Sequence, residues 1–246
     1  MSQPFIQVTG LTIGWGDVVL QKDATFEVQR GEVFAILGGS GCGKSTLLRY
    51  LIGLEAPLSG EVVIDGLGRP NLETGRPPFG VMFQSGALLG SITVGENVGL
   101  ALEEWTSLPY AAIAAIVLAK LKLVGLEGSA NKFPSELSGG MKKRAAIARA
   151  MALEPELLFL DEPSAGLDPV TSAELDELIL TLNTVLGLTV VIVSHELPSV
   201  FKIAKRCIML DKDTKSIIAT GDPRELRDQN KDPRVHDFFN RIPRSA

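Results

Sequence analysis

The feature of the sequence that most constrains the fold is a glycine-rich stretch that reads Gly-Gly-Ser-Gly-Cys-Gly-Lys-Ser over residues 38–45. It fits the pattern G-x-x-x-x-G-K-[ST], follows the apolar run Val33–Leu37 and precedes apolar residues at helical spacing. Glycines let the backbone wrap tightly, so that successive N–H groups point at phosphate oxygens, and the start of a helix adds partial positive charge. Because a strand and a helix flank the stretch, we expect a phosphate-binding loop rather than an ordinary glycine-rich turn.

The residues of this loop have separate expected roles. The Lys44 ammonium reaches the β- and γ-phosphates of a bound nucleotide, and the Ser45 hydroxyl is small enough to bind Mg²⁺. Cys42 has two interpretations, either a redox-sensitive thiol or a small residue that the loop tolerates. The residues expected to bind the phosphates are Gly38, Gly39, Ser40, Gly41, Cys42, Gly43, Lys44 and Ser45.

Length and composition limit the architecture around the loop. The chain has 246 residues, which at about 150 residues per domain corresponds to one large domain or a core with an insertion. With 24 Lys and Arg against 29 Asp and Glu, the net charge of −5 argues against binding duplex DNA by bulk charge. Cys42 and Cys207 match no zinc-ligand spacing and indicate a reducing compartment. Neither a signal peptide nor a membrane helix is expected.

Hydrophobic patterns predict an α/β fold. Alternating or β-branched segments at Phe5–Ile13, Val18–Val28 and Glu61–Asp65 predict antiparallel strands. Between residues 85 and 153 Ala and Leu dominate, which indicates a helical insertion. Apolar runs that alternate with helices, such as one over Thr171–Leu186, predict a parallel sheet from strands at 33–37, 81–83, 157–160, 189–193 and 207–210.

The apolar strand Leu157–Leu160 ends in two acids, Asp161 and Glu162. Adjacent strand residues point to opposite faces, so the two carboxylates cannot do the same work. In a protein with a phosphate loop, the first acid after the strand is the metal partner, which leaves Glu162 as the general base. Two solvated acids that merely end a strand are the alternative.

A second glycine-containing segment, Leu137-Ser138-Gly139-Gly140-Met141, precedes the basic helical stretch Lys142–Ala150. Alone, Ser138 with the two glycines is either an anion site or a plain helix N-cap. A phosphate loop, this segment and Asp161-Glu162, in that order, resemble the nucleotide-binding domain of ABC transporters. The resemblance covers nearly the whole chain. It implies a P-loop NTPase with the ABC-ATPase fold, which has an antiparallel β subdomain and an inserted α-helical subdomain.

The resemblance also implies roles for residues that are weak signals alone. Gln84 lies where the family has its Q-loop glutamine, residues 164–168 look like the D-loop, and His195 looks like the switch histidine that contacts the γ-phosphate. Trp15 looks like the aromatic residue that stacks on adenine. A histidine after a strand or a single tryptophan is otherwise more commonly structural. The implied cofactors are ATP and Mg²⁺; the implied catalytic residues are Glu162, His195, Gln84 and Lys44, and the implied metal ligands are Ser45, Gln84 and Asp161.

By the same resemblance, two copies of the chain face head to tail. Ser138, Gly139 and Gly140 of one copy then cap the ATP that Gly38 to Thr46 of the other copy hold. We expect an ATP-binding core with the β subdomain over residues 1–84 and 155–230, the helical subdomain over residues 85–154, and a C-terminal tail over residues 231–246.

Several short sequence segments resemble one subgroup of the family. Met141 stands where the family usually has glutamine, and with the segments 83–88, 134–137, 153–156 and 232–240 it resembles the ATPase subunits of bacterial MCE-associated (Mla-type) lipid transporters. This implies phospholipid transport between bacterial membranes, powered from the cytoplasmic face of the inner membrane by a peripheral subunit. The implied partners are a membrane permease, an MCE substrate-binding protein and a small STAS-domain subunit, and no nucleic acid.

Other functions remain as alternatives at this point. The chain could serve another ABC importer or exporter, or be a non-transport ABC ATPase that acts on DNA or ribosomes. Such non-transport proteins usually carry a long coiled-coil insertion or two tandem cassettes, and 246 residues accommodate neither. A P-loop kinase would leave Leu137–Met141 and His195 unexplained.

The C-terminal tail carries an apolar stripe of Val235, Phe238, Phe239 and Ile242 at helical spacing. This stripe either packs on the core of the same chain or docks on a partner or sister subunit.

Overall fold

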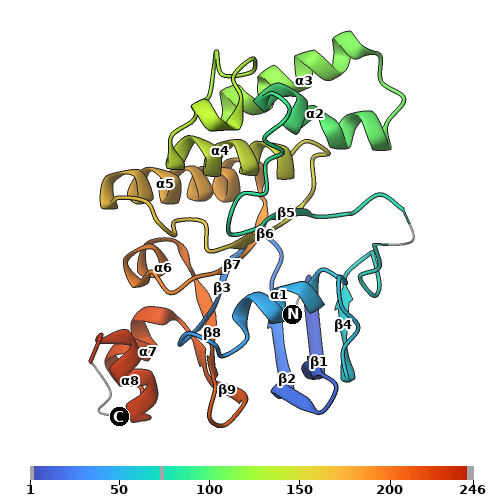
Figure 1. Cartoon of the computed structure of the whole chain (residues 1–246). Coiled ribbons are helices and arrows are strands. Elements are labelled where there is room, and N and C mark those ends of the chain that lie inside the picture. The colour runs from blue at the N-terminus through green and yellow to red at the C-terminus, as the bar shows by residue number, and fades with distance from the viewer. Residues whose placement is uncertain (1–2, 73–74, 243–246) are drawn as a thin grey trace. The chain divides into compact units, whose positions relative to one another are not determined.

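The computed structural model describes residues 3–72 and 75–242, which fold into two compact units. The first unit is formed by the described residues up to Gly75 together with those from Thr189 onward, and the second by Arg76–Leu188. In Figure 1 the first unit is blue to cyan and orange to red, and the second is mainly green to light orange. Each unit has strands and a core of its own.

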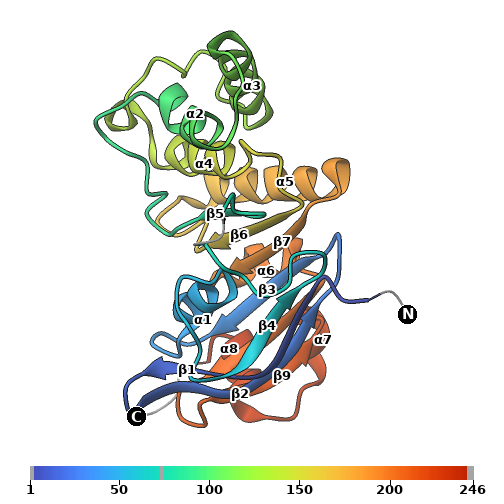
Figure 2. The same ribbon diagram turned by 90° about the vertical axis from the view of Figure 1, so that its right-hand side faces the viewer.

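One sheet of the first unit is antiparallel, as expected. It contains β1 (Ile6–Trp15), β2 (Val18–Val28) and β4 (Ser59–Ile64) in the order β2-β1-β4, with Ile6 of the central strand opposite Val28 and Ile64. Buried and more exposed residues alternate along much of β1 and β2, so one face of each strand lies in the core. Figure 2 shows these three strands side by side.

The second group of strands in this unit follows the parallel pattern. β3 (Val33–Gly38) lies between β7 (Thr189–Val193) and β8 (Arg206–Asp211), parallel to both, and every residue of β3 and β7 is buried. Such continuous apolar runs are typical of central parallel strands. β9 (Ser216–Gly221) pairs antiparallel with β8. The sequence reading missed β9, whose half-buried pattern is that of an edge strand.

Among the described residues, four helices complete the first unit. α1 (Lys44–Leu51) packs against β1, β3 and β7, and α7 (Pro223–Gln229) packs against α6 (Leu197–Ile203), β9 and α8 (Pro233–Phe239). α1 buries Leu47, Leu48 and Leu51, which are among the apolar residues at helical spacing expected after the phosphate loop. α8 is the predicted helix of the tail.

The apolar stripe of the tail packs largely on its own unit. Val235 and Phe239 are buried, and the Phe239 ring centroid lies 5.9 Å from that of Phe201 on α6. Phe238 is half-buried and Ile242 is 45% exposed. The buried pair favours the first of the two interpretations of the stripe, packing on the core of the same chain.

In the second unit, β5 (Gly80–Met82) and β6 (Leu157–Asp161) form a parallel pair with Met82 opposite Leu160. All described elements between residues 85 and 154 are helical, in line with the Ala- and Leu-rich composition. The division of the units at Arg76 and Thr189 does not test the expected segment boundaries at residues 84, 154 and 230, which stay a prediction. The helical elements of this unit are α2 (Val94–Trp105), α3 (Tyr110–Leu123), a 3-10 turn (Pro134–Glu136), α4 (Gly139–Ala150) and α5 (Pro169–Leu186).

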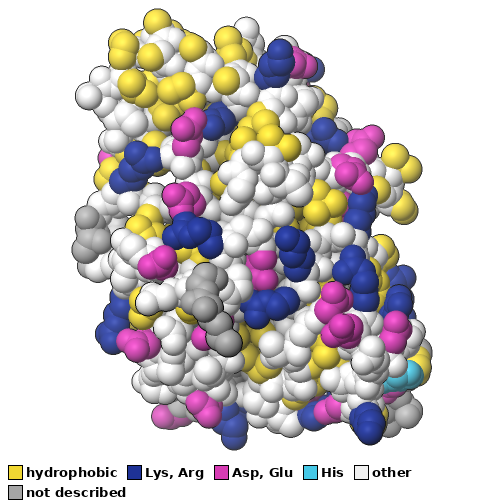
Figure 3. Space-filling model, turned by 180° about the vertical axis from the view of Figure 1, so that it is seen from behind, with side chains coloured by type: hydrophobic (Ala, Val, Ile, Leu, Met, Phe, Trp, Pro, Cys, Tyr) yellow, Lys and Arg dark blue, Asp and Glu magenta, His cyan; other side chains and the backbone are white. Residues whose placement is uncertain are grey.

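Two further observations concern the surface and the membrane. On the face seen in Figure 3, basic and acidic side chains are interspersed rather than gathered into a single-sign stripe. Within residues 3–72 and 75–242, no helix combines the length and apolarity needed to cross a bilayer.

Candidate nucleotide-binding and catalytic residues

The phosphate loop connects β3 to α1 in the first unit with the backbone geometry that its glycines allow. Gly38 has φ +145°, and a Cβ there would lie 2.5 Å from the Leu210 carbonyl oxygen and 2.6 Å from Cys42 Sγ. No other residue fits this close approach without movement of the backbone. Gly43, with φ +94°, is the N-cap of α1, and its lack of a side chain leaves the first N–H groups of the helix to a ligand.

Lys44 lies folded over the loop. Its Nζ donates hydrogen bonds to the carbonyl oxygens of Gly38, at 3.0 Å, and Gly39, at 3.2 Å. The ammonium is therefore held at the loop and can exchange one of these acceptors for a phosphate oxygen, which forms a stronger, charge-assisted bond.

A buried glutamine supports the loop from β2. Gln21 is 0% exposed, and its Nε2 donates to the Cys42 carbonyl oxygen, at 2.8 Å, and to the Asp211 carbonyl oxygen at the end of β8, at 3.0 Å. The sequence reading missed this residue, because Gln21, Lys22 and Asp23 form a polar run that is typical of a solvent-exposed segment. The only available signal was the position of Gln21 within a predicted strand.

The two residues whose carbonyl oxygens accept from Gln21 also have side chains with shifted pKa values. Burial raises the pKa of the Asp211 carboxyl, but hydrogen bonds from Thr214 and Asp213 and the nearby Arg234 outweigh it, so that the pKa is lowered overall. Cys42 is 2% exposed and burial raises the pKa of its thiol. The structure thus favours a small packed residue over a redox-sensitive thiol at this position.

His195 and Trp15 belong to the same unit as the loop. His195 follows β7, the parallel neighbour of β3, so it lies beyond the same carboxyl edge as the phosphate loop, and its side chain is 54% exposed. Trp15 ends β1 and is 50% exposed, with its indole Nε1 donating to Glu55 Oε2 at 2.8 Å. An anchored and exposed indole face suits stacking on a base better than it suits core packing.

Gln84, Asp161 and Glu162 lie together in the second unit. β5 and β6 are parallel neighbours; Gln84 follows the carboxyl end of β5, Asp161 is the last residue of β6 and Glu162 follows it. Asp161 and Glu162 are 6% and 5% exposed. Glu162 has φ +47°, a left-handed conformation that is uncommon for a non-glycine residue and recurs at functional sites.

The Ser-Gly-Gly segment begins α4 in the second unit. Ser138 is the N-cap, and its Oγ accepts a hydrogen bond from the Met141 N–H at 3.3 Å. Gly140 is buried where a Cβ would lie 2.4 Å from Thr171 Cγ2, so a larger residue there would require the Thr171 side chain at the start of α5 to move. Asp168 of the D-loop segment caps α5 by accepting from Val170 and Thr171.

Two cations of α4 were not recognised from sequence. Lys143 is 8% exposed and donates to the carbonyl oxygens of Gln84 and Glu162, and Arg149 donates to those of Gly86 and Ala87. In the sequence both appear as part of a basic amphipathic stretch. Their only signal was a position on the same helix as many small apolar residues.

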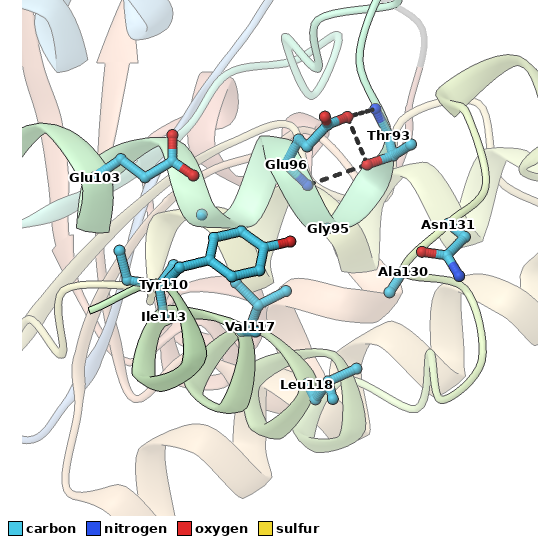
Figure 4. A pocket seen from close by; sticks show the side chains of 12 residues that line it. Thr93, Gly95, Glu96, Glu103, Tyr110, Ile113, Val117, Leu118, Ala130 and Asn131 are labelled. Carbon is cyan, nitrogen blue, oxygen red and sulfur yellow. Dashed lines mark hydrogen bonds between the residues drawn. The ribbon is translucent and has the colours of Figure 1, made fainter. Parts of the chain in front are cut away.

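Two hollows lie beside these elements. One of about 380 Å³ touches Gly39, Ser40 and Cys42 of the phosphate loop and also Phe238 of α8. The other, of about 460 Å³, lies between α2 and α3, where Figure 4 shows the Tyr110 ring and the hydrogen-bonded pair Thr93 and Glu96 that caps α2. The second hollow contains none of the predicted nucleotide-binding residues.

The structure therefore groups the predicted residues by unit. The phosphate loop, Trp15 and His195 belong to the first unit, and Gln84, Ser138–Gly140, Asp161 and Glu162 belong to the second. The expected Mg²⁺ ligands are a hydroxyl, an amide oxygen and a carboxylate, and such hard oxygen donors suit this ion.

Comparison with known proteins defines the class. The ABC transporter family model matches residues 21–165, and the chain belongs to this family: it is an ATP-binding subunit that hydrolyses ATP. It is 44% identical over 232 residues to the intermembrane phospholipid transport system ATP-binding protein MlaF of Escherichia coli K12, covering 92% of this chain and 85% of the relative. It is 41% identical to the probable ribonucleotide transport ATP-binding protein mkl of Mycobacterium leprae, covering 96% of this chain and 68% of that protein.

A solved structure matches the fold of the chain. It is the dimeric post-hydrolysis state of the ATP-binding cassette MJ0796 bound to ADP and Pi, with a TM-score of 0.77 and 31% identity, covering 88% of this chain and 98% of that one. The predicted ABC-ATPase fold and the ATPase activity are thereby confirmed, and the family works as dimers with a membrane permease.

Proposed function

We propose that this chain powers phospholipid movement between bacterial membranes, as a peripheral subunit on the cytoplasmic face of the inner membrane. The observation that carries the proposal is its 44% identity, over 92% of its length, to a phospholipid transport ATP-binding protein. Met141 after Gly140 and the tail segment Asp232–Asn240 support it, because they carry part of the resemblance to Mla-type ATPases. The similarity to mkl makes a nucleotide substrate the competing assignment.

The assembly that we propose contains two copies of this chain head to tail. Ser138–Gly140 of one copy cap the ATP held by Gly38–Thr46 of the other. A permease, an MCE substrate-binding protein and a small STAS-domain subunit complete the transporter, and no nucleic acid takes part. The net charge of −5 supports the last point, and on the face seen in Figure 3 basic and acidic side chains are mixed.

In the ATPase site that we propose, Trp15 stacks on the adenine and the N–H groups of the phosphate loop, with Lys44, hold the phosphates. Glu162 accepts a proton from a water whose oxygen bonds to the γ-phosphorus, while the bond to the β–γ bridging oxygen breaks and ADP leaves. His195 donates to the γ-phosphate, and Gln84 orients the water. Ser45, Gln84 and Asp161 would hold Mg²⁺, which neutralises phosphate charge when bound.

The experiment that tests the function starts from the full chain expressed together with the permease and the other subunits of the proposed transporter. ATP hydrolysis is measured with and without the co-purified subunits, and transfer of a labelled phospholipid is measured between vesicles. We expect ATP-dependent lipid transfer that the Glu162→Gln variant loses while it still binds ATP and is trapped as a dimer. Uptake of a labelled ribonucleotide without lipid transfer would overturn the phospholipid assignment, and near wild-type hydrolysis by Glu162→Gln would overturn Glu162 as the base.

A further inference from the structure

A buried lysine, Lys143, joins two segments of the second unit that carry proposed catalytic residues. Its Nζ lies 2.5 Å from the carbonyl oxygen of Gln84 and 3.2 Å from that of Glu162. One segment follows β5 and the other follows β6, and Lys143 reaches both from α4. A single side chain therefore links the backbone of the Q-loop glutamine to the backbone of the glutamate.

Burying this amine is costly unless its surroundings compensate. Lys143 is 8% exposed, and desolvation lowers its pKa, while the carboxylates of Asp161 and Glu162 oppose that shift. An uncompensated buried charge strongly destabilises a protein, so cations at such positions are paired or hydrogen-bonded. The two carbonyl oxygens and the two acids supply this compensation at the proposed catalytic residues.

Glu162 has an unfavourable backbone conformation, and two hydrogen bonds to its carbonyl oxygen help to hold it. With φ +47°, Glu162 occupies a left-handed conformation that is unfavourable for an L-residue and persists only where the surroundings hold it. Its carbonyl oxygen accepts from Lys143 Nζ and from the Ala165 N–H, at 3.2 Å each. These two bonds fix the peptide that determines where the Glu162 side chain starts.

The Q-loop side is held in the same way by a second cation of α4. Arg149 donates to the carbonyl oxygens of Gly86, at 2.9 Å, and Ala87, at 2.6 Å, and Ala87 also has a positive φ of 49°. Lys143 and Arg149 thus hold residues 84–87 against α4 over more than one helical turn. Of the two, Lys143 alone also reaches Glu162 among the described contacts.

We infer that Lys143 is a positioning residue for ATP hydrolysis, one that couples the placement of Gln84 to that of Glu162. The inference rests on the proposed roles of these two residues. Because the phosphate loop belongs to other elements, Lys143 acts on turnover rather than on nucleotide affinity. Neither its amine nor its charge needs to touch the nucleotide for this role.

The test compares Lys143→Met, Lys143→Arg and a matched control in the full chain with its co-purified membrane subunits. Met keeps the length of the side chain and removes the donor. We expect kcat to fall by about tenfold to 100-fold, the size typical of small misplacements of catalytic groups, with the Kd for ATP changed by less than about threefold. Lys143→Arg, which keeps a cationic donor, should recover part of kcat.

Arg144→Met is the matched control. Arg144 is a half-buried cation on the same helix that also donates to a backbone carbonyl oxygen, that of Val124, and pairs with Glu174, at 3.4 Å and 2.8 Å. Its loss should lower the melting temperature without the fall in kcat. A purely structural role for Lys143 would give the two Met variants the same kinetics, and that result would overturn the inference.

A double-variant cycle separates positioning from general weakening. In a Gln84→Ala background, Lys143→Met should lower kcat by less than it does in the wild type, because residues that act as a unit are not additive. Independent, multiplicative effects would count against the coupling.

The Glu162→Gln variant distinguishes failure of the inference from failure of the proposed site. If Glu162→Gln is inactive while Lys143→Met is fully active, the inference fails and the proposed site stands. If Glu162→Gln is active, the proposed site itself fails.

Discussion

Gln21 Nε2 donates a 2.8 Å hydrogen bond to the carbonyl oxygen of Cys42, so a side chain of the antiparallel sheet holds the backbone of the phosphate loop. The same amide group also holds the end of β8 through the Asp211 carbonyl oxygen. Both hydrogens of one side-chain amide are thus used to fix the loop between two strands. The loop is shaped by its glycines and supported from outside its own sequence.

Replacing Gln21 by Met should weaken nucleotide binding more than turnover. Two buried carbonyl oxygens would lose their donor, at roughly 1 kcal/mol each, and the loop would lose its defined shape. We expect the Kd for ATP to rise by about threefold to tenfold with kcat nearly unchanged, measured by fluorescent nucleotide titration and steady-state kinetics. Phe26→Leu on the same strand is the control, since Phe26 is a buried residue whose ring stacks on that of Phe34 with centroids 5.7 Å apart. Equal effects of both variants on Kd would contradict the role of Gln21.

Replacing Lys44 by Ala should remove a large part of the nucleotide affinity. A hydrogen bond to a charged group contributes roughly 1.5–3 kcal/mol, so the Kd for ATP should rise by about tenfold to 100-fold. Calorimetric titration of the purified chain measures this change, with the exposed Lys22→Ala as a control of equal charge. Full retention of affinity by Lys44→Ala would exclude the proposed phosphate contact.

Phe239→Ala tests how the tail packs. Phe239 is 3% exposed, and truncating a buried phenylalanine lowers the free energy of unfolding by about 3 kcal/mol or more. Ile242→Ala, at a position that is 45% exposed, should change it by less than about 1 kcal/mol. Urea denaturation gives both values. Unchanged stability of Phe239→Ala together with poorer co-purification of membrane subunits would instead support docking of the tail on a partner.

Asp211 should make stability depend on acid pH. Its pKa is lowered in the folded chain, so its charge stabilises the fold above the unfolded pKa of about 3.9, and this contribution is lost as the pH falls through the lower, folded value. The difference in stability between wild type and Asp211→Asn should therefore be largest near pH 6 and shrink toward pH 3. Asp17→Asn, at an exposed turn, serves as the control. A difference independent of pH would show that the charge of Asp211 is not responsible.

Much of the fold could be predicted because its signals are local. The strand from Val18 to Val28 and the strand from Thr189 to Val193 were predicted with the bounds that the structure shows, since β-branched and apolar runs between turns have few alternatives. β9 was missed because a half-buried edge strand carries a weak pattern. A short turn connects β8 to β9, but nothing in the residues Ser216–Gly221 indicates that this segment pairs with β8.

The candidate site divides in the same way. The phosphate loop and the acids Asp161 and Glu162 are contiguous, and their spacing alone indicates their chemistry. Gln21 and Lys143 act through hydrogen bonds to backbone carbonyl oxygens that are distant in sequence, at least 21 residues away for Gln21 and at least 19 for Lys143. No sequence pattern indicates which carbonyl oxygen a side chain will contact. Supporting residues of this kind become visible only when the fold is known.

Both thiols of the chain, Cys42 and Cys207, are buried in the first unit, and burial raises the pKa of Cys207 to about 12. A thiol-labelling reagent can therefore modify either one only during an opening of the structure. Cys42 lies in the phosphate loop and Cys207 in the strand β8. The labelling rate of Cys42 therefore reports local opening of the loop, and the labelling rate of Cys207 reports unfolding of the sheet. Bound nucleotide should slow the labelling of Cys42 much more than that of Cys207, and no engineered cysteine is needed to measure this.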